Sequence, residues 1–321
     1  MKAGQIAVVG AGTMGHGIAQ VFALAGFEVS LTDSDPKVLK SAIPRIQANL
    51  EVFLEHEFVS QDEAAAVPLR IALTPDLAEA VARADFVFEA VFEDLEVKHR
   101  VFRQLEAHCP ARAIIASNTS SFCARDMAVA LARPDRFLVT HFWNPPHIMP
   151  LVEVVPGKHT SDETVRTMLA LLKDAGKRPA LVRKDVPGFV GNRLQHALRR
   201  EAIAIVAQGI ATPEDVDLVA RLSFGLRLFL LGPLETVDLG SGLDLTLAIQ
   251  SYLLPELDRS TEPLPLVRDK VARGELGAKT GKGFYDWSPG QAARAIQRRD
   301  EALLEMVKWL RDLDDPGRAS G

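Results

Sequence analysis

A glycine-rich turn near the amino terminus constrains the fold of this chain more than any other feature. Residues 10–15 read Gly-Ala-Gly-Thr-Met-Gly and directly follow the apolar run Ile6–Val9. In a strand–turn–helix unit, Gly10 permits the tight turn and Gly12 lets the backbone approach a pyrophosphate. Gly15 lets the next helix pack closely on the strand. The turn therefore predicts a strand, a phosphate-binding loop and a helix in succession.

The residues after the turn match the rest of a dinucleotide-binding unit. Apolar residues recur at helical spacing over residues 18–24, and a second β-rich run over residues 27–32 ends at Asp33. A carboxylate about twenty residues after the turn accepts hydrogen bonds from the ribose hydroxyls of NAD and repels the 2′-phosphate of NADP. An ordinary βαβ unit with a glycine turn is the alternative. We predict an NAD site formed by Gly10, Gly12, Thr13, Met14, Gly15 and Asp33.

Composition excludes several classes of protein. The 321 residues suffice for two domains, and a net charge of −5 gives no basic surface for nucleic acid. No apolar run is long enough to span a bilayer, and no leader precedes the first predicted strand. The two cysteines, Cys109 and Cys123, form neither a disulfide framework nor a metal site. We expect a cytoplasmic protein without a metal, a nucleic-acid partner or a membrane partner.

The order of patterns along the chain predicts two domains. In the first half, short β-branched runs alternate with amphipathic stretches, which is typical of a parallel sheet with helices on both faces. A charged segment containing Pro and Gly, residues 183–188, marks a hinge, and the pattern beyond it is helical. We expect an α/β Rossmann-like NAD-binding domain over residues 1–185 and an all-α domain over residues 186–321. Further strands are predicted at residues 86–88, 114–116, 137–140, 151–155 and 179–182.

Polar residues gather where the predicted strands of the first domain end. The loop 117–121 follows one strand, and His141 follows another. Glu153 stands inside an aliphatic strand, where an ionised carboxylate requires a partner, and His141 is the natural one. Beside a nicotinamide, such a histidine can take the proton from a hydroxyl while the carboxylate fixes its tautomer. A structural histidine and a solvent-facing glutamate are the alternative.

Six segments in one order resemble the 3-hydroxyacyl-CoA dehydrogenase family. They extend over nearly the whole chain, so that together they are specific. The resemblance implies a Rossmann-like domain, a helical domain that forms a homodimer, and NAD-dependent oxidation of an L-3-hydroxyl to the 3-keto product. The segments are Val8–Gly15, Ser117–Ser121, His141–Pro146, Leu151–Val155, Pro187–Arg193 and Lys279–Asp286.

The resemblance also implies roles for individual residues. His141 matches the catalytic base of the family, and Glu153 matches the residue that orients it. Ser120 matches a substrate-binding serine, and Asn192 matches a residue that positions the substrate. Three further positions, Glu93, Lys98 and Asn118, are assigned to the side of the site that faces the cofactor. The start of a charged helix would explain Glu93 and Lys98 equally well.

The identity of the substrate stays open at this point. Family members that act on CoA esters typically carry lysines on a helical hairpin and after Met149, but here residues 46–69 are acidic without Lys or Arg and the latter position is Pro150. A 3-hydroxyacyl-CoA is the default. A small non-CoA hydroxylated carboxylate, as in the branch with L-gulonate 3-dehydrogenase and λ-crystallin, is the first alternative, and a non-catalytic dinucleotide-binding protein is the second.

A second histidine, His147, follows His141 in the same loop, and we expect it to be solvated.

Overall fold

The computed structural model describes residues 4–314, which form two compact units. The first unit contains the residues up to Asn192 and the residues from Ile296 onward, and the second contains Arg193–Ala295. The last helix, α15 (Gln291–Asp314), therefore contributes most of its length to the first unit. The sequence analysis grouped these residues with the second domain.

An eight-stranded sheet forms the centre of the first unit, with the order β3-β2-β1-β4-β5-β6-β7-β8. All neighbours are parallel except β6 and β7, which are antiparallel. The predicted α/β Rossmann-like architecture is confirmed, and the reversal at β7 is the one departure from a parallel sheet. The strands are β1 (Ile6–Val9), β2 (Val29–Thr32), β3 (Ile71–Leu73), β4 (Phe86–Glu89), β5 (Ile114–Ser117), β6 (Phe137–Phe142), β7 (Leu151–Pro156) and β8 (Arg178–Leu181).

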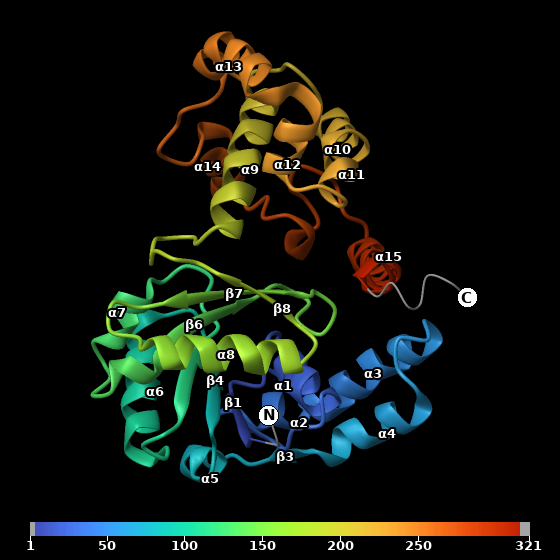
Figure 1. The fold of residues 1–321 in the computed structure, drawn as a ribbon. Helices are drawn as coiled ribbons and strands as arrows, with labels where there is room; N and C mark the ends of the chain where they lie inside the picture. Colours follow the sequence, from blue (N-terminus) through green and yellow to red (C-terminus); the bar gives the residue numbers. More distant parts are fainter. Residues whose placement is uncertain (1–3, 315–321) are drawn as a thin grey trace. The chain divides into compact units, whose positions relative to one another are not determined.

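Helices cover both faces of this sheet (Figure 1). Alternate residues of β1 point to opposite sides, so that Ile6 and Val8 join one apolar cluster while Ala7 and Val9 join the other. Helices α1, α3, α4 and α8 pack in the first cluster, and α5, α6 and α7 pack in the second. The helices of this unit are α1 (Gly15–Leu24), α2 (Pro36–Lys40), α3 (Ala42–Glu55), α4 (Gln61–Leu69), α5 (Leu77–Val81), α6 (Leu95–His108), α7 (Ala124–Ala128) and α8 (Asp162–Asp174).

A third apolar cluster joins α15 to the hairpin formed by α3 and α4. Leu304 and Val307 of α15 are buried against Phe53 of α3 and Ile148 of the loop after β6. Polar contacts surround this cluster: His56 Nδ1 lies 2.7 Å from Glu305 Oε1. The apolar side of the hairpin is thus covered by a segment distant in the sequence.

The second unit is helical, as its sequence predicts. Its longest helix, α9 (Gly191–Ala207), starts in the first unit and continues into the second. Among residues 4–314, no helix combines the length and the apolar character needed to cross a membrane. The other helices of the unit are α10 (Pro213–Leu222), α11 (Phe224–Leu228), α12 (Pro233–Thr236), α13 (Gly242–Leu253) and α14 (Pro265–Ala272), with the short helical turns Val237–Ser241, Leu254–Glu256 and Ala278–Thr280.

Candidate active site

The centre of the candidate site is a pair of side chains held opposite each other by two strands. In the antiparallel pairing of β6 and β7, His141 lies directly across from Glu153. His141 Nδ1 is 2.9 Å from Glu153 Oε2, and the two residues are only 6% and 1% exposed. The contact expected from the sequence is present. His141 lies within β6, however, rather than in a loop after it.

The second oxygen of Glu153 binds the start of α9. Glu153 Oε1 accepts hydrogen bonds from the backbone N–H groups of Val190 and Gly191, each at 3.0 Å. Burial acts to raise the pKa of Glu153, but the hydrogen bonds from His141 and from these two amides outweigh it and lower the pKa below its ordinary value. An ionised Glu153 accepts a hydrogen bond, so that Nδ1 of His141 carries the proton. Nε2 is then the basic nitrogen of the ring.

A buried ion pair supports the neighbouring loop 117–121. Lys98 Nζ lies 2.8 Å from Glu89 Oε1 and 3.2 Å from Glu93 Oε2. Glu93 in turn accepts hydrogen bonds from Thr119 Oγ1 at 2.5 Å and from the backbone N–H of Ser120 at 3.1 Å. Burial alone would raise the pKa of Glu93, but these hydrogen bonds and the charge of Lys98 bring it below its ordinary value. The network holds the backbone of Ser120 in place.

Sequence reasoning singled out Glu93 and Lys98 but missed Glu89. This residue ends β4 with no exposed surface, and it also accepts hydrogen bonds from Ser117 Oγ and the backbone N–H of Val91. Its position at the end of an apolar strand was the available signal, because a buried carboxylate requires partners. Lys98 is buried, and its ammonium group is bound by the two glutamates. Glu93 also lines a cavity that the glycine turn shares.

Two asparagines tie this loop to its neighbours. Asn118 Oδ1 accepts a hydrogen bond from the backbone N–H of Phe142 at 2.9 Å, next to His141. Asn192 Nδ2 donates to the backbone oxygen of Ser120 at 2.9 Å. The structure thus brings Ser120, Asn118, His141 and Asn192 to one cavity, which all four residues line.

The glycine turn opens onto the same cavity, whose volume is about 970 Å³. A Cβ on Gly15 would lie 1.7 Å from the backbone oxygen of Gly10, so that the helix could not pack there with any side chain. Gly10 has φ +100° and faces the backbone of Ala90, whereas a Cβ on Gly12 would meet nothing within 4 Å. Gly12 therefore leaves open space beside the start of α1, which is where a pyrophosphate needs room.

Asp33, directly after the carboxyl end of β2, also lines this cavity. Its two carboxylate oxygens accept hydrogen bonds from the backbone N–H groups of Ala11 at 2.7 Å and Asp35 at 2.8 Å. The same backbone segment receives a hydrogen bond from Arg45, which donates to the oxygen of Ala11. The cavity, the glycine cradle and this carboxylate fit a dinucleotide with an unsubstituted ribose 2′-hydroxyl. Thr13 and Met14 also line it.

One expectation is wrong: His147 is not solvated. Burial lowers its pKa to about 3, with smaller effects from His16 and Lys177, and its Nδ1 has no hydrogen-bond partner among the described residues. It lines a second cavity that shares no lining residue with the first. His147 lies in the turn between β6 and β7, whereas His141 lies within β6.

Comparison with known proteins identifies the family of the chain. The model of the 3-hydroxyacyl-CoA dehydrogenase NAD-binding domain matches residues 5–186, and that of the C-terminal domain of the same family matches residues 188–287. The chain belongs to the 3-hydroxyacyl-CoA dehydrogenase family. It is an NAD-dependent oxidoreductase that acts on a CH–OH group. Among residues 4–314, no group of three or more His, Cys, Asp or Glu side chains is placed to hold a metal ion.

Two kinds of relative are similar to the chain. A 5-formyl-3-hydroxy-2-methylpyridine 4-carboxylate 5-dehydrogenase of Mesorhizobium japonicum is 34% identical, over 94% of this chain and 96% of its own. A probable 3-hydroxybutyryl-CoA dehydrogenase of Bacillus subtilis is 40% identical, over 89% and 98%. Among solved structures, a 5-formyl-3-hydroxy-2-methylpyridine 4-carboxylic acid 5-dehydrogenase, described as an NAD⁺-dependent dismutase, superposes with a TM-score of 0.88, at 31% identity, over 97% of this chain and 98% of its own. The (S)-3-hydroxybutyryl-CoA dehydrogenase of Ralstonia eutropha gives 0.75, at 35% identity, over 89% and 100%.

Proposed function

We propose that His141 is the general base in an NAD-dependent oxidation of a hydroxyl-bearing carbon. The observation that carries this proposal is the buried hydrogen bond between His141 Nδ1 and Glu153 Oε2, which leaves Nε2 to accept the hydroxyl proton. Bound NAD⁺ supplies the acceptor for the hydride that leaves the same carbon. As the proton moves to His141, the imidazolium that forms is stabilised by the ionised Glu153.

The substitution His141→Gln tests this role. Loss of a general base lowers kcat by about 10²–10⁴, whereas NADH binding, measured by fluorescence titration, should stay unchanged. Retained turnover with intact NADH binding would show that another group accepts the proton.

The residues around this pair receive supporting roles in the proposal. Ser120 and Asn192 would bind the substrate hydroxyl or its neighbouring oxygen, because their polar side chains line the cavity next to His141. Asn118 and Glu93 would contact the cofactor, and Lys98 would hold Glu93 in position.

Asp33 would select NAD over NADP by at least tenfold in kcat/KM, because its charge repels the 2′-phosphate. Asp33→Ala should narrow that ratio. Equal kcat/KM values for the two cofactors in the unaltered enzyme would contradict this assignment.

For the substrate, we propose a small hydroxylated carboxylate rather than a CoA thioester. The supporting observation is that α15 packs on the apolar side of the α3–α4 hairpin, through Leu304, Val307 and the stacking of Arg311 4.0 Å from the centre of the Phe58 ring. The exposed side of the hairpin is acidic, so that it repels the phosphates of CoA. Its exposed carboxylates are Glu51, Glu55, Glu57, Asp62 and Glu63.

The second candidate is a 3-hydroxyacyl-CoA, which the names of several relatives favour. A panel of L-3-hydroxybutyryl-CoA, free 3-hydroxybutyrate and L-gulonate, followed by NADH production, separates the two. We expect turnover of a small acid and weak, salt-sensitive binding of the thioester. A micromolar KM for the thioester that does not change with ionic strength would support the second candidate. NADH binding without any product would point to a non-catalytic protein.

We also propose that two copies of the chain associate through the second unit. Within residues 193–295, large apolar side chains are exposed on several helices, which is unusual for a surface in contact with water. A second copy would cover them, as the family resemblance implies. The most exposed examples on α12, α13 and the turn between them are Leu234, Leu239, Leu243 and Leu247, at 70–80%.

A further inference from the structure

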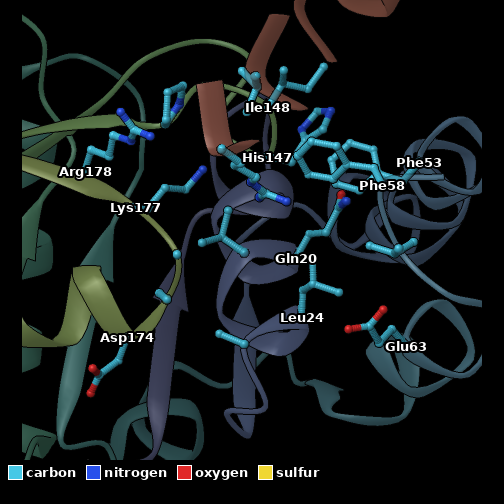
Figure 2. A pocket seen from close by; sticks show the side chains of 18 of the residues that line it. Gln20, Leu24, Phe53, Phe58, Glu63, His147, Ile148, Asp174, Lys177 and Arg178 are labelled. Atoms are coloured by element: carbon cyan, nitrogen blue, oxygen red, sulfur yellow. The ribbon is translucent and has the colours of Figure 1, made fainter. Parts of the chain in front are cut away.

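A second cavity in the first unit has features of a binding site that the proposed reaction does not use. Its volume is about 280 Å³, just below the range of about 300–1,000 Å³ typical of ligand pockets, so that it suits a small molecule. Its walls come from α1, the α3–α4 hairpin, the loop carrying His147, the segment before β8, and α15 (Figure 2).

The ammonium group of Lys177 is the central feature of this cavity. Lys177 is only 8% exposed, and its Nζ donates to the backbone oxygens of Pro146 at 2.7 Å and Met149 at 2.9 Å. Within the described part of the chain, no carboxylate lies within ion-pair distance of this nitrogen. Burial, with a smaller effect from Arg311, lowers the pKa of Lys177 to about 7. A buried cation with one remaining N–H and no counter-charge attracts an anion.

A second donor in the wall also lacks an acceptor. The side chain of Gln20 is fully buried, and its Oε1 accepts a hydrogen bond from Asn49 Nδ2 at 2.9 Å. Its Nε2 has no partner among the described residues. Figure 2 shows the amide directed toward His147 and Phe58, on the side of the cavity. With no exposed surface, this amide is a polar group inside the wall and does not itself reach the cavity.

The remaining charged groups of the wall are already engaged. Glu63 accepts hydrogen bonds from the backbone N–H and the hydroxyl of Ser60. Arg178 donates to the backbone oxygen of Leu310, and Arg311 stacks on Phe58. Asp174, the other carboxylate of the wall, is likewise not free. The rest of the surface is apolar and aromatic, with Leu24, Phe53, Ile148 and Val307.

We propose that this cavity binds a small carboxylate with an aromatic or aliphatic body. The carboxylate accepts a hydrogen bond from the remaining N–H of Lys177, and the body packs between the hairpin and α15. The site is separate from the cofactor cavity, so that it does not depend on the proposed function.

The test uses 4-fluorobenzoate as the probe, with binding followed by ¹⁹F NMR at pH 6.5 in the presence of saturating NADH. The neutral analogue 4-fluorobenzyl alcohol measures the contribution of the carboxylate. Lys177→Met removes the ammonium group. Val307→Trp fills the cavity from α15 and leaves the hydrogen bonds of Lys177 in place. It therefore tests the site even if Lys177→Met disturbs the loop that carries Pro146 and Met149. Asn192→Ala, in the other cavity, is the matched control.

We expect the unaltered protein and Asn192→Ala to bind the probe with equal affinity. Lys177→Met and Val307→Trp should each weaken binding at least tenfold while melting cooperatively and binding NADH. The neutral analogue should bind at least tenfold more weakly than the acid. Unchanged affinity in either cavity variant, equal affinity for the alcohol, or loss of the probe in Asn192→Ala would overturn the proposal.

Discussion

At the residue scale, Glu153 performs two tasks with its two oxygens. One oxygen holds His141, and the other holds the backbone amides at the start of α9. Such a carboxylate stabilises a positive imidazolium while it fixes the ring in one orientation. The charge and the geometry of the pair therefore depend on one side chain.

The substitution Glu153→Gln should separate charge from shape. The amide cannot stabilise the imidazolium, and one of its ends presents N–H groups to donors. We expect kcat to fall about 10- to 100-fold, less than for loss of the base itself, and the acid limb of the pH–rate profile to move toward lower pH. Glu163→Gln, at an exposed position of α8, is the control and should leave the profile unchanged. An unmoved acid limb in Glu153→Gln would mean that the two residues are not coupled.

Lys177 should give the stability of the protein a measurable pH dependence. The folded protein releases the Lys177 proton near pH 7, whereas the unfolded chain holds it to about pH 10.5. Between these values the unfolded state binds more protons, so that the free energy of unfolding rises with pH, by up to about 1.4 kcal/mol per unit, and the gain is absent below pH 7. In Lys177→Met, urea unfolding from pH 6.5 to 9 should lack this rise, whereas Lys40→Met, at an exposed position, should keep it. The same slope in all three proteins would contradict the assignment.

At the element scale, α15 should stabilise the hairpin by burying apolar surface. Leu304 is 1% exposed in the cluster with Phe53 and Val307. Leu304→Ala should lower the free energy of unfolding by about 2–5 kcal/mol, because it removes buried methyl groups and leaves a cavity. Ile296→Ala, at a position of the same helix that is 51% exposed, should cost far less. Similar losses in the two variants, measured by urea unfolding, would show that α15 does not depend on this contact.

The elements differ in how far the sequence could predict them. The strand, turn and helix around Gly10 follow from local patterns, and the contact between His141 and Glu153 follows from the cost of a buried carboxylate. The antiparallel pairing of β6 and β7 was missed, although the connection over residues 143–150 is too short for the crossover that parallel strands require. The second cavity could not be foreseen, because its walls come from segments distant in the sequence.

At the scale of the whole molecule, the exposed apolar side chains of the second unit should set the state of association. Leu243, 73% exposed on α13, is a suitable probe because a charge there would oppose burial against a second copy. Leu243→Asp should lower the mass measured by light scattering from that of a dimer toward that of one chain. Leu69→Asp, in the first unit at 85% exposure, is the control and should keep the dimer. A single-chain mass for the unaltered protein would contradict the proposed association.

Helix α9 begins with the amide groups bound by Glu153 and continues, past Asn192, into the second unit. The same carboxylate that faces His141 is therefore the acceptor for the first amides of this helix. A substitution that removes it leaves His141 without its partner and the amides of Val190 and Gly191 without their acceptor. The helix that carries the chain into the second unit is thus anchored by the group that orients the proposed base.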